Sequence, residues 1–159
     1  MFVVVDEAPV YLDLDACKGD KEAERRVRTS RAMLGQLVRR GRSVMIFTLI
    51  ISQKPTSDAV PPSIRDQAAL RLCFGVATID GAISVLGEGI RQYPTLSPVM
   101  LQGPEHVGLA TALLRTGTDP YTRLRVPEIS EAAADARAAE TAHLRRDPRL
   151  PAAADPVFA

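Results

Sequence analysis

The stretch that most constrains this chain is its opening apolar run, residues 2–5, which two carboxylates follow at once, Asp6 and Glu7. Three of the four residues are valines, and a continuous apolar run of β-branched residues is typical of a parallel strand buried on both faces of a sheet. Adjacent carboxylates at the end of a buried strand are costly to desolvate unless they meet a cation or a ligand. Because open α/β sheets bind ligands at the carboxyl ends of their strands, the run predicts a ligand site there.

The same pattern is expected of a Walker B element. In such an element the aspartate holds Mg²⁺, directly or through water, and the glutamate polarises the water that attacks a γ-phosphate. An ordinary core strand followed by an acidic turn has the same sequence, so the motif on its own leaves both interpretations open.

A second apolar run, VMIFTLII at residues 44–51, predicts another interior parallel strand. Gln53 follows its carboxyl end. If the two strands are neighbours, Gln53 lies beside the end of the first strand and could bond a phosphate oxygen or a lytic water. Alternatively, Gln53 only begins a loop.

The rest of the chain predicts an α/β domain with a largely parallel sheet. Apolar residues recur with helical spacing from about residue 20 to residue 40, and Gly41 follows as a stop signal. The other expected elements are a short helix at 60–69, a strand at 70–76, a helix at 79–86 capped by Thr78, a hairpin of strands 108–114 and 121–126 around a turn at 117–120, and a helix at 129–146. The proline-rich residues 91–107 are expected to be loop, with room for an edge strand at 98–101.

Taken in order, these motifs resemble the second half of the FtsK/SpoIIIE motor domain over about residues 2–135. The likeness lies in VVVDEAP, in LVRRGRSVMIFTLIISQKP, in SIRDQAALRLCFGV, in TIDGAISVLGEG and in the closing hairpin. The style is that of actinobacterial plasmid-transfer members. The resemblance implies a partial RecA-like P-loop NTPase core, mainly parallel, with a C-terminal β-hairpin and a trailing helix. Its expected boundaries are residues 1–127 for the half motor domain, 128–147 for an Ala/Arg-rich helix and 148–159 for a disordered tail.

That family consists of ring ATPases that pull double-stranded DNA through a hexamer. The resemblance therefore implies that Asp6 holds Mg²⁺, that Glu7 is the catalytic base, and that Gln53 is the polar sensor beside the nucleotide. An arginine from the neighbouring subunit would complete the site. Arg42 is the first choice, because it follows a glycine at a helix-to-strand turn, and Arg71 is the second. Arg71 could equally be an ordinary strand arginine that pairs with a carboxylate.

The main departure from the family is that no G-x-x-x-x-G-K-[ST] phosphate loop occurs in these 159 residues. A second departure is Gln67, which stands where the family has asparagine. We therefore expect ATP and Mg²⁺ to bind only with a Walker A half supplied by an upstream half-domain, and we expect the chain to be inactive alone. A truncated gene, a miscalled start, a split subunit and a remnant all fit that expectation.

Two other functions remain open on sequence grounds. The chain could be a non-enzymatic module that docks on intact ring subunits, or an unrelated doubly wound α/β nucleotide-binding or signalling domain. The arginines of residues 25–42 indicate either a solvated helix face or a contact with DNA or another subunit, while the net charge of +1 argues neither way. Two cysteines without metal-ligand spacing favour a reduced, cytoplasmic protein, and no apolar stretch is long enough for a membrane span.

Overall fold

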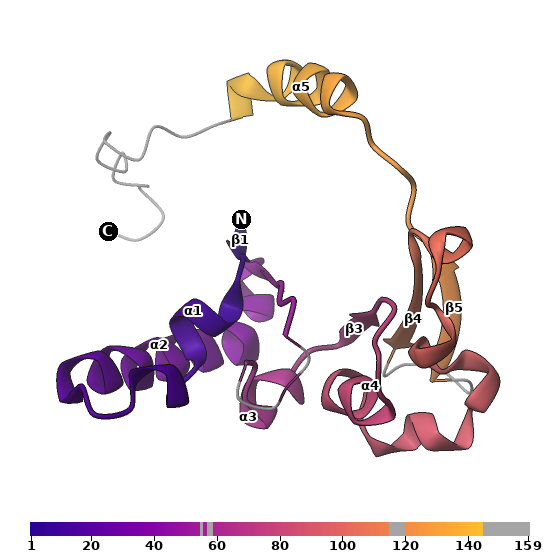
Figure 1. The fold of residues 1–159 in the computed structure, drawn as a ribbon. Coiled ribbons are helices and arrows are strands. Elements are labelled where there is room, and N and C mark those ends of the chain that lie inside the picture. Colours follow the sequence, from indigo (N-terminus) through magenta and orange to yellow (C-terminus); the bar gives the residue numbers. More distant parts are fainter. Residues whose placement is uncertain (55, 57–58, 115–119, 145–159) are drawn as a thin grey trace. The chain divides into compact units, whose positions relative to one another are not determined.

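The computed structural model describes residues 1–54, 56, 59–114 and 120–144 of the chain (Figure 1). They belong to two compact units, Met1–Val126 and Pro127–Ala159, which are described separately.

The first sheet of unit 1 consists of two parallel strands, β1 (Phe2–Val5) and β2 (Phe47–Ile50), with Phe2 opposite Phe47 and Val5 opposite Ile50. The connection between them runs through α1 (Ala8–Leu12), a 3₁₀ turn (Asp15–Cys17), α2 (Lys21–Arg40) and a second 3₁₀ turn (Gly41–Val44). A short helix, α3 (Pro62–Arg65), follows. One face of the sheet packs on a core of helix residues, namely Ala8, Leu12, Leu34 and Ile64.

The other face of this sheet is exposed, which corrects the prediction that both strands are buried on both faces. Phe2 and Val4 are 76% and 59% exposed, and their partners Phe47 and Leu49 are 47% and 52% exposed. The alternation of side chains along a strand explains the pattern, because α1, α2 and α3 supply apolar partners to only one face.

Helix α2 begins and ends where the sequence predicts. The Asp20 carboxylate caps its first turn by accepting hydrogen bonds from the backbone N–H groups of Glu22 and Ala23, each at 3.0 Å. Val27 and Leu34, seven residues apart, are buried. At its end, a Cβ on Gly41 would come within 3.0 Å of the Ile46 carbonyl oxygen, so the small residue lets the chain turn tightly into β2.

The second sheet of unit 1 is antiparallel and has the order β3 (Leu70–Cys73), β4 (Leu109–Leu114) and β5 (Tyr121–Arg125). Helix α4 (Ile79–Leu86) packs against it over a core that includes Cys73, Leu86 and Tyr121. The α/β class and the hairpin are confirmed, but the prediction of a mainly parallel sheet holds only for β1 and β2. The reason is that β3 pairs with the hairpin strand β4, and within the described residues it does not pair with β2.

Between α4 and β4 the chain forms four short 3₁₀ turns, at Glu88–Gln92, Pro94–Leu96, Pro98–Met100 and Pro104–His106. The edge strand considered at 98–101 is therefore wrong. Ser97 caps the third turn by accepting from the Val99 N–H, and the proline that opens each of the last three turns suits a first helical position. Of the predicted hairpin turn at 117–120, residues 117–119 lie outside the described residues.

Unit 2 contains the trailing helix α5 (Glu131–Glu140), capped by Ser130, and a 3₁₀ turn (Ala142–Leu144). None of the residues of α5 is buried, in keeping with an apolar face made almost entirely of alanine. The tail expected at 148–159 lies outside the described residues. Among the described helices, none combines the length and the apolar character needed to cross a bilayer.

Candidate functional site

Glu7 occupies the sharp turn between β1 and α1. Its backbone lies in the left-handed region, with φ 50° and ψ 51°, which is uncommon for a residue other than glycine. The turn brings the start of α1 against the end of β2, where the Ala8 N–H donates to the Ile51 carbonyl at 2.9 Å. Sparsely populated backbone conformations of this kind cluster at functional sites, which makes Glu7 a candidate functional residue.

The side chains of Glu7 and Gln53 meet at the carboxyl edge of the β1–β2 sheet. Gln53 Nε2 donates to Glu7 Oε1 at 2.5 Å, although 46 residues separate the two positions. The contact follows from the parallel pairing, because the carboxyl ends of neighbouring parallel strands lie at the same edge. The structure thus brings together the two residues that the sequence placed at one site.

Asp6 lies at the same edge, and its Oδ1 accepts a hydrogen bond from the Glu7 N–H at 2.9 Å. Asp6, Glu7 and Gln53 are all exposed. The described residues contain no cluster of three or more acidic, histidine or cysteine side chains that could hold a metal alone. Mg²⁺ is commonly bound by one or two carboxylates together with water and substrate phosphates. The donors at this edge therefore fit Mg²⁺ that arrives with a nucleotide, and they do not form a metal cage of their own.

An ion pair between exposed Lys54 and buried Asp13 anchors the turn that carries Gln53. Lys54 Nζ lies 3.1 Å from Asp13 Oδ2, and Asp13 Oδ1 also accepts from the backbone N–H groups of Asp15 and Ala16. The hydrogen bond from Lys54, together with these two N–H bonds, holds the pKa of the Asp13 carboxyl below its ordinary value, although burial opposes the shift. Within the turn, the Ser52 hydroxyl accepts from the Lys54 N–H at 3.2 Å and donates to the Lys54 carbonyl at 3.0 Å.

Sequence reasoning missed Asp13. The only local signal is that an aspartate can cap the backbone N–H groups two and three residues after it. That signal does not indicate an ion pair with a lysine 41 residues away. Asp13 and Lys54 together tie the end of α1 to the loop after β2 that carries Gln53.

The two arginines considered as completing residues lie elsewhere. Arg42 is exposed in the 3₁₀ turn before β2, at the opposite end of that strand from Gln53, so it cannot reach the site within its own chain. Arg71, on β3, has only 10% of its side chain exposed. Its guanidinium lies 3.2 Å from Asp66 Oδ1 and donates to the Val85 carbonyl at 3.5 Å. This is the geometry of a strand arginine that pairs with a carboxylate.

Comparison with known proteins places the fold. No family model matches the chain, and no curated protein matches it. Among solved structures, it is similar to the pCW3 conjugation coupling protein TcpA, solved in its monomer form with ATPγS, with a TM-score of 0.58 and 20% sequence identity. The match covers 78% of this chain and 31% of the coupling protein's chain. At this identity the similarity shows the fold alone, a mixed α/β arrangement that this chain shares with part of the coupling protein.

Proposed function

We propose that this chain is the Walker B half of an ATP-dependent double-stranded DNA translocase of the FtsK/SpoIIIE type, serving conjugative transfer or a related process. The observation that carries the proposal is the contact of Gln53 with Glu7 at the carboxyl edge of two paired parallel strands. The similarity in fold to a conjugation coupling protein solved with ATPγS supports it.

Each of the three polar residues at this edge has a role in the proposal. Asp6 would hold Mg²⁺, directly or through water. Glu7 accepts the proton of the attacking water, and Gln53, through its amide, holds the Glu7 carboxylate in position and contacts the γ-phosphate or that water. Bound Mg²⁺ would neutralise charge that develops on the β- and γ-phosphates.

The proposal requires a phosphate-binding loop from another segment or subunit, because these 159 residues contain none. We therefore expect no measurable ATP binding by the 159-residue chain at micromolar concentration, and tight Mg-ATP binding would contradict that expectation. In a hexameric ring, Arg42 of one subunit would complete the site of the next. Its exposure and its place at the amino end of β2 allow it to project toward a neighbour.

A second candidate function is that of a non-enzymatic module that docks on intact ring ATPase subunits. The exposed apolar face of the β1–β2 sheet, formed by Phe2, Val4, Phe47 and Leu49, favours it, since large exposed apolar patches mark interaction surfaces. The two functions differ in whether the polar edge of that sheet does chemistry. A docking module would tolerate Asp6→Asn and Glu7→Gln, whereas the ATPase half would not.

Paramagnetic Mn²⁺, added with ATPγS in place of Mg²⁺, tests the proposed metal position in this chain joined to a phosphate-loop segment. In protein labelled with ¹⁵N at the glutamine side chains, we expect Mn²⁺ to broaden the Gln53 amide signal before those of Gln92 and Gln102. Asp6→Asn should abolish that preference, and Asp80→Asn, at a similarly exposed carboxylate, should leave it unchanged. Equal broadening of all the glutamine signals would contradict the assignment of Asp6.

A further inference from the structure

The outer face of α2 is basic in its first two turns and again in its last turn. Buried Val27 and Leu34 define the inner face of the helix, and the residues on the opposite side are exposed. The exposed cationic residues on that side, called here the outer face, are Lys21, Arg25, Arg28, Arg39 and Arg40. At a rise of 1.5 Å per residue, they lie within a span of about 28 Å, as two groups separated by about 16 Å in which Ala32, Met33 and Gln36 are exposed.

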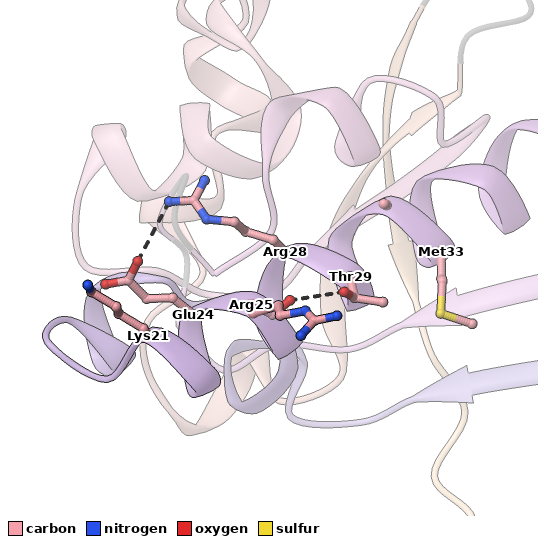
Figure 2. A pocket seen from close by; sticks show the side chains of 7 residues that line it. Lys21, Glu24, Arg25, Arg28, Thr29 and Met33 are labelled. Carbon is pink, nitrogen blue, oxygen red and sulfur yellow. Dashed lines mark hydrogen bonds and ion pairs between the residues drawn. The ribbon is translucent and has the colours of Figure 1, made fainter.

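The first half of the outer face contains a shallow, open hollow (Figure 2). Lys21, Arg25 and Arg28 line it together with the shorter side chains of Thr29 and Ala32. Glu24 is the only acidic residue of its lining. Arg28 forms an ion pair with Glu24 at 3.8 Å, and a solvent-screened pair at that distance contributes little to stability.

Most of this positive charge is not compensated within the described part of the chain. Arg25, Arg39 and Arg40 have no acidic partner among the described residues, whereas Arg91 and Arg137 are held in ion pairs at 2.9 and 2.6 Å. Residues 18–42 contain nine lysines and arginines against three acidic residues, a net charge of +6 in a chain whose total is +1. The charge of this chain is therefore concentrated on one helix and its flanks.

We propose that the outer face of α2 binds the phosphate backbone of double-stranded DNA. A 28 Å length of duplex carries about 16 phosphate charges, so several cations of the face can each meet a phosphate. The proposal extends the proposed function by naming a surface that contacts DNA. DNA binding by this surface needs no nucleotide site, however, so the proposed surface and the proposed ATPase function can be refuted separately.

The structure favours a duplex over a membrane. A helix that lies in a bilayer interface inserts an apolar face, but Leu34 of α2 packs in the same core as Leu12 of α1 and Ile64 of α3. Met33 is the one exposed large hydrophobic residue of α2. The outer face also has no aromatic side chain on which the bases of a single strand could stack.

Fluorescence anisotropy with a labelled 24-base-pair duplex, measured from 50 to 200 mM NaCl, tests the proposal on the 159-residue chain. The outer-face variant carries Arg25→Gln, Arg28→Gln and Arg39→Gln. The matched control carries Arg91→Gln, Arg125→Gln and Arg137→Gln, which lowers the net charge by the same three units. Glutamine is a good helix former and the substituted arginines of α2 are exposed, so α2 should remain folded.

We expect the outer-face variant to bind at least twentyfold more weakly at 50 mM NaCl, and its slope of log K against log salt to fall by about 2 to 3. The control and Glu7→Gln should bind within threefold of the unsubstituted chain. The lysine variant, with Arg25→Lys, Arg28→Lys and Arg39→Lys, keeps the charge and should also bind within threefold.

Four results would overturn the proposal. They are no binding by the unsubstituted chain at 50 mM NaCl, equal losses in the outer-face variant and the control, loss of binding in the lysine variant, and tighter binding to vesicles of anionic lipid than to the duplex.

Discussion

Asp13→Asn removes the ion pair that anchors the Gln53 turn and leaves the other bonds of Asp13 in place. The asparagine oxygen can still accept from the N–H groups of Asp15 and Ala16, so the loss is confined to the bond with Lys54 at 3.1 Å. A hydrogen bond to a charged group contributes about 1.5 to 3 kcal/mol. Because the Lys54 side chain is 56% exposed, solvent screens the pair, and we expect a cost below that range, about 1 kcal/mol.

The assay is a double-mutant cycle of Asp13→Asn and Lys54→Met, measured by urea unfolding. We expect a coupling energy of about 1 kcal/mol at pH 7. The exposed pair of Glu88 and Arg91 is the control, and its coupling should be at most about 0.5 kcal/mol.

The coupling should also depend on pH. Because the folded-state pKa of Asp13 is lowered, its stabilisation is fully present above the ordinary value of 3.8 and is lost as the pH falls through the folded-state value. Between pH 5 and pH 2 the unsubstituted chain should therefore lose more unfolding free energy than Asp13→Asn does. A coupling energy below about 0.3 kcal/mol at pH 7, or one that does not change with pH, would refute this reasoning.

Two further predictions concern the second sheet and its surroundings. Cys73 is 3% exposed, and burial raises the pKa of its thiol to about 11. At pH 8 it should therefore react with a maleimide at least about 100-fold more slowly than Cys17. Equal rates would show that this core opens readily. Gly75→Ala would place a Cβ 2.2 Å from the Leu101 carbonyl oxygen and should lower the free energy of unfolding, measured with urea, by about 2 kcal/mol or more. Its control is Gly35→Ala, whose Cβ would have its nearest neighbouring atom at 3.9 Å and which should not destabilise the chain.

The elements predicted well are those specified by nearby residues. Helix α2 was predicted from apolar residues at helical spacing, of which Val27 and Leu34 are buried, and α4 from Thr78, whose hydroxyl accepts from the Gly81 N–H at 3.1 Å. The Glu7–Gln53 contact was also predictable, although it spans 46 residues, because parallel pairing of two apolar strands brings their carboxyl ends together.

The features that escaped prediction depend on partners that local sequence does not specify. The exposure of Phe2 and Phe47 depends on which layers cover the sheet, and an apolar run looks the same whether one face or two are covered. The antiparallel pairing of β3 with β4 depends on which edge is available to each strand. The Asp13–Lys54 pair joins two charges that each look like ordinary surface residues.

In the proposed function, Glu7 activates the water in a nucleotide site to which this chain contributes one side. The most direct measurement is the steady-state rate of ATP hydrolysis by this chain joined to a phosphate-loop segment, with Glu7→Gln compared against Glu105→Gln. Because glutamine can still accept from Gln53 but cannot take a proton, we expect Glu7→Gln to bind ATP and to hydrolyse it at least about 100-fold more slowly. Hydrolysis by Glu7→Gln at the rate of the Glu105→Gln control would contradict the account.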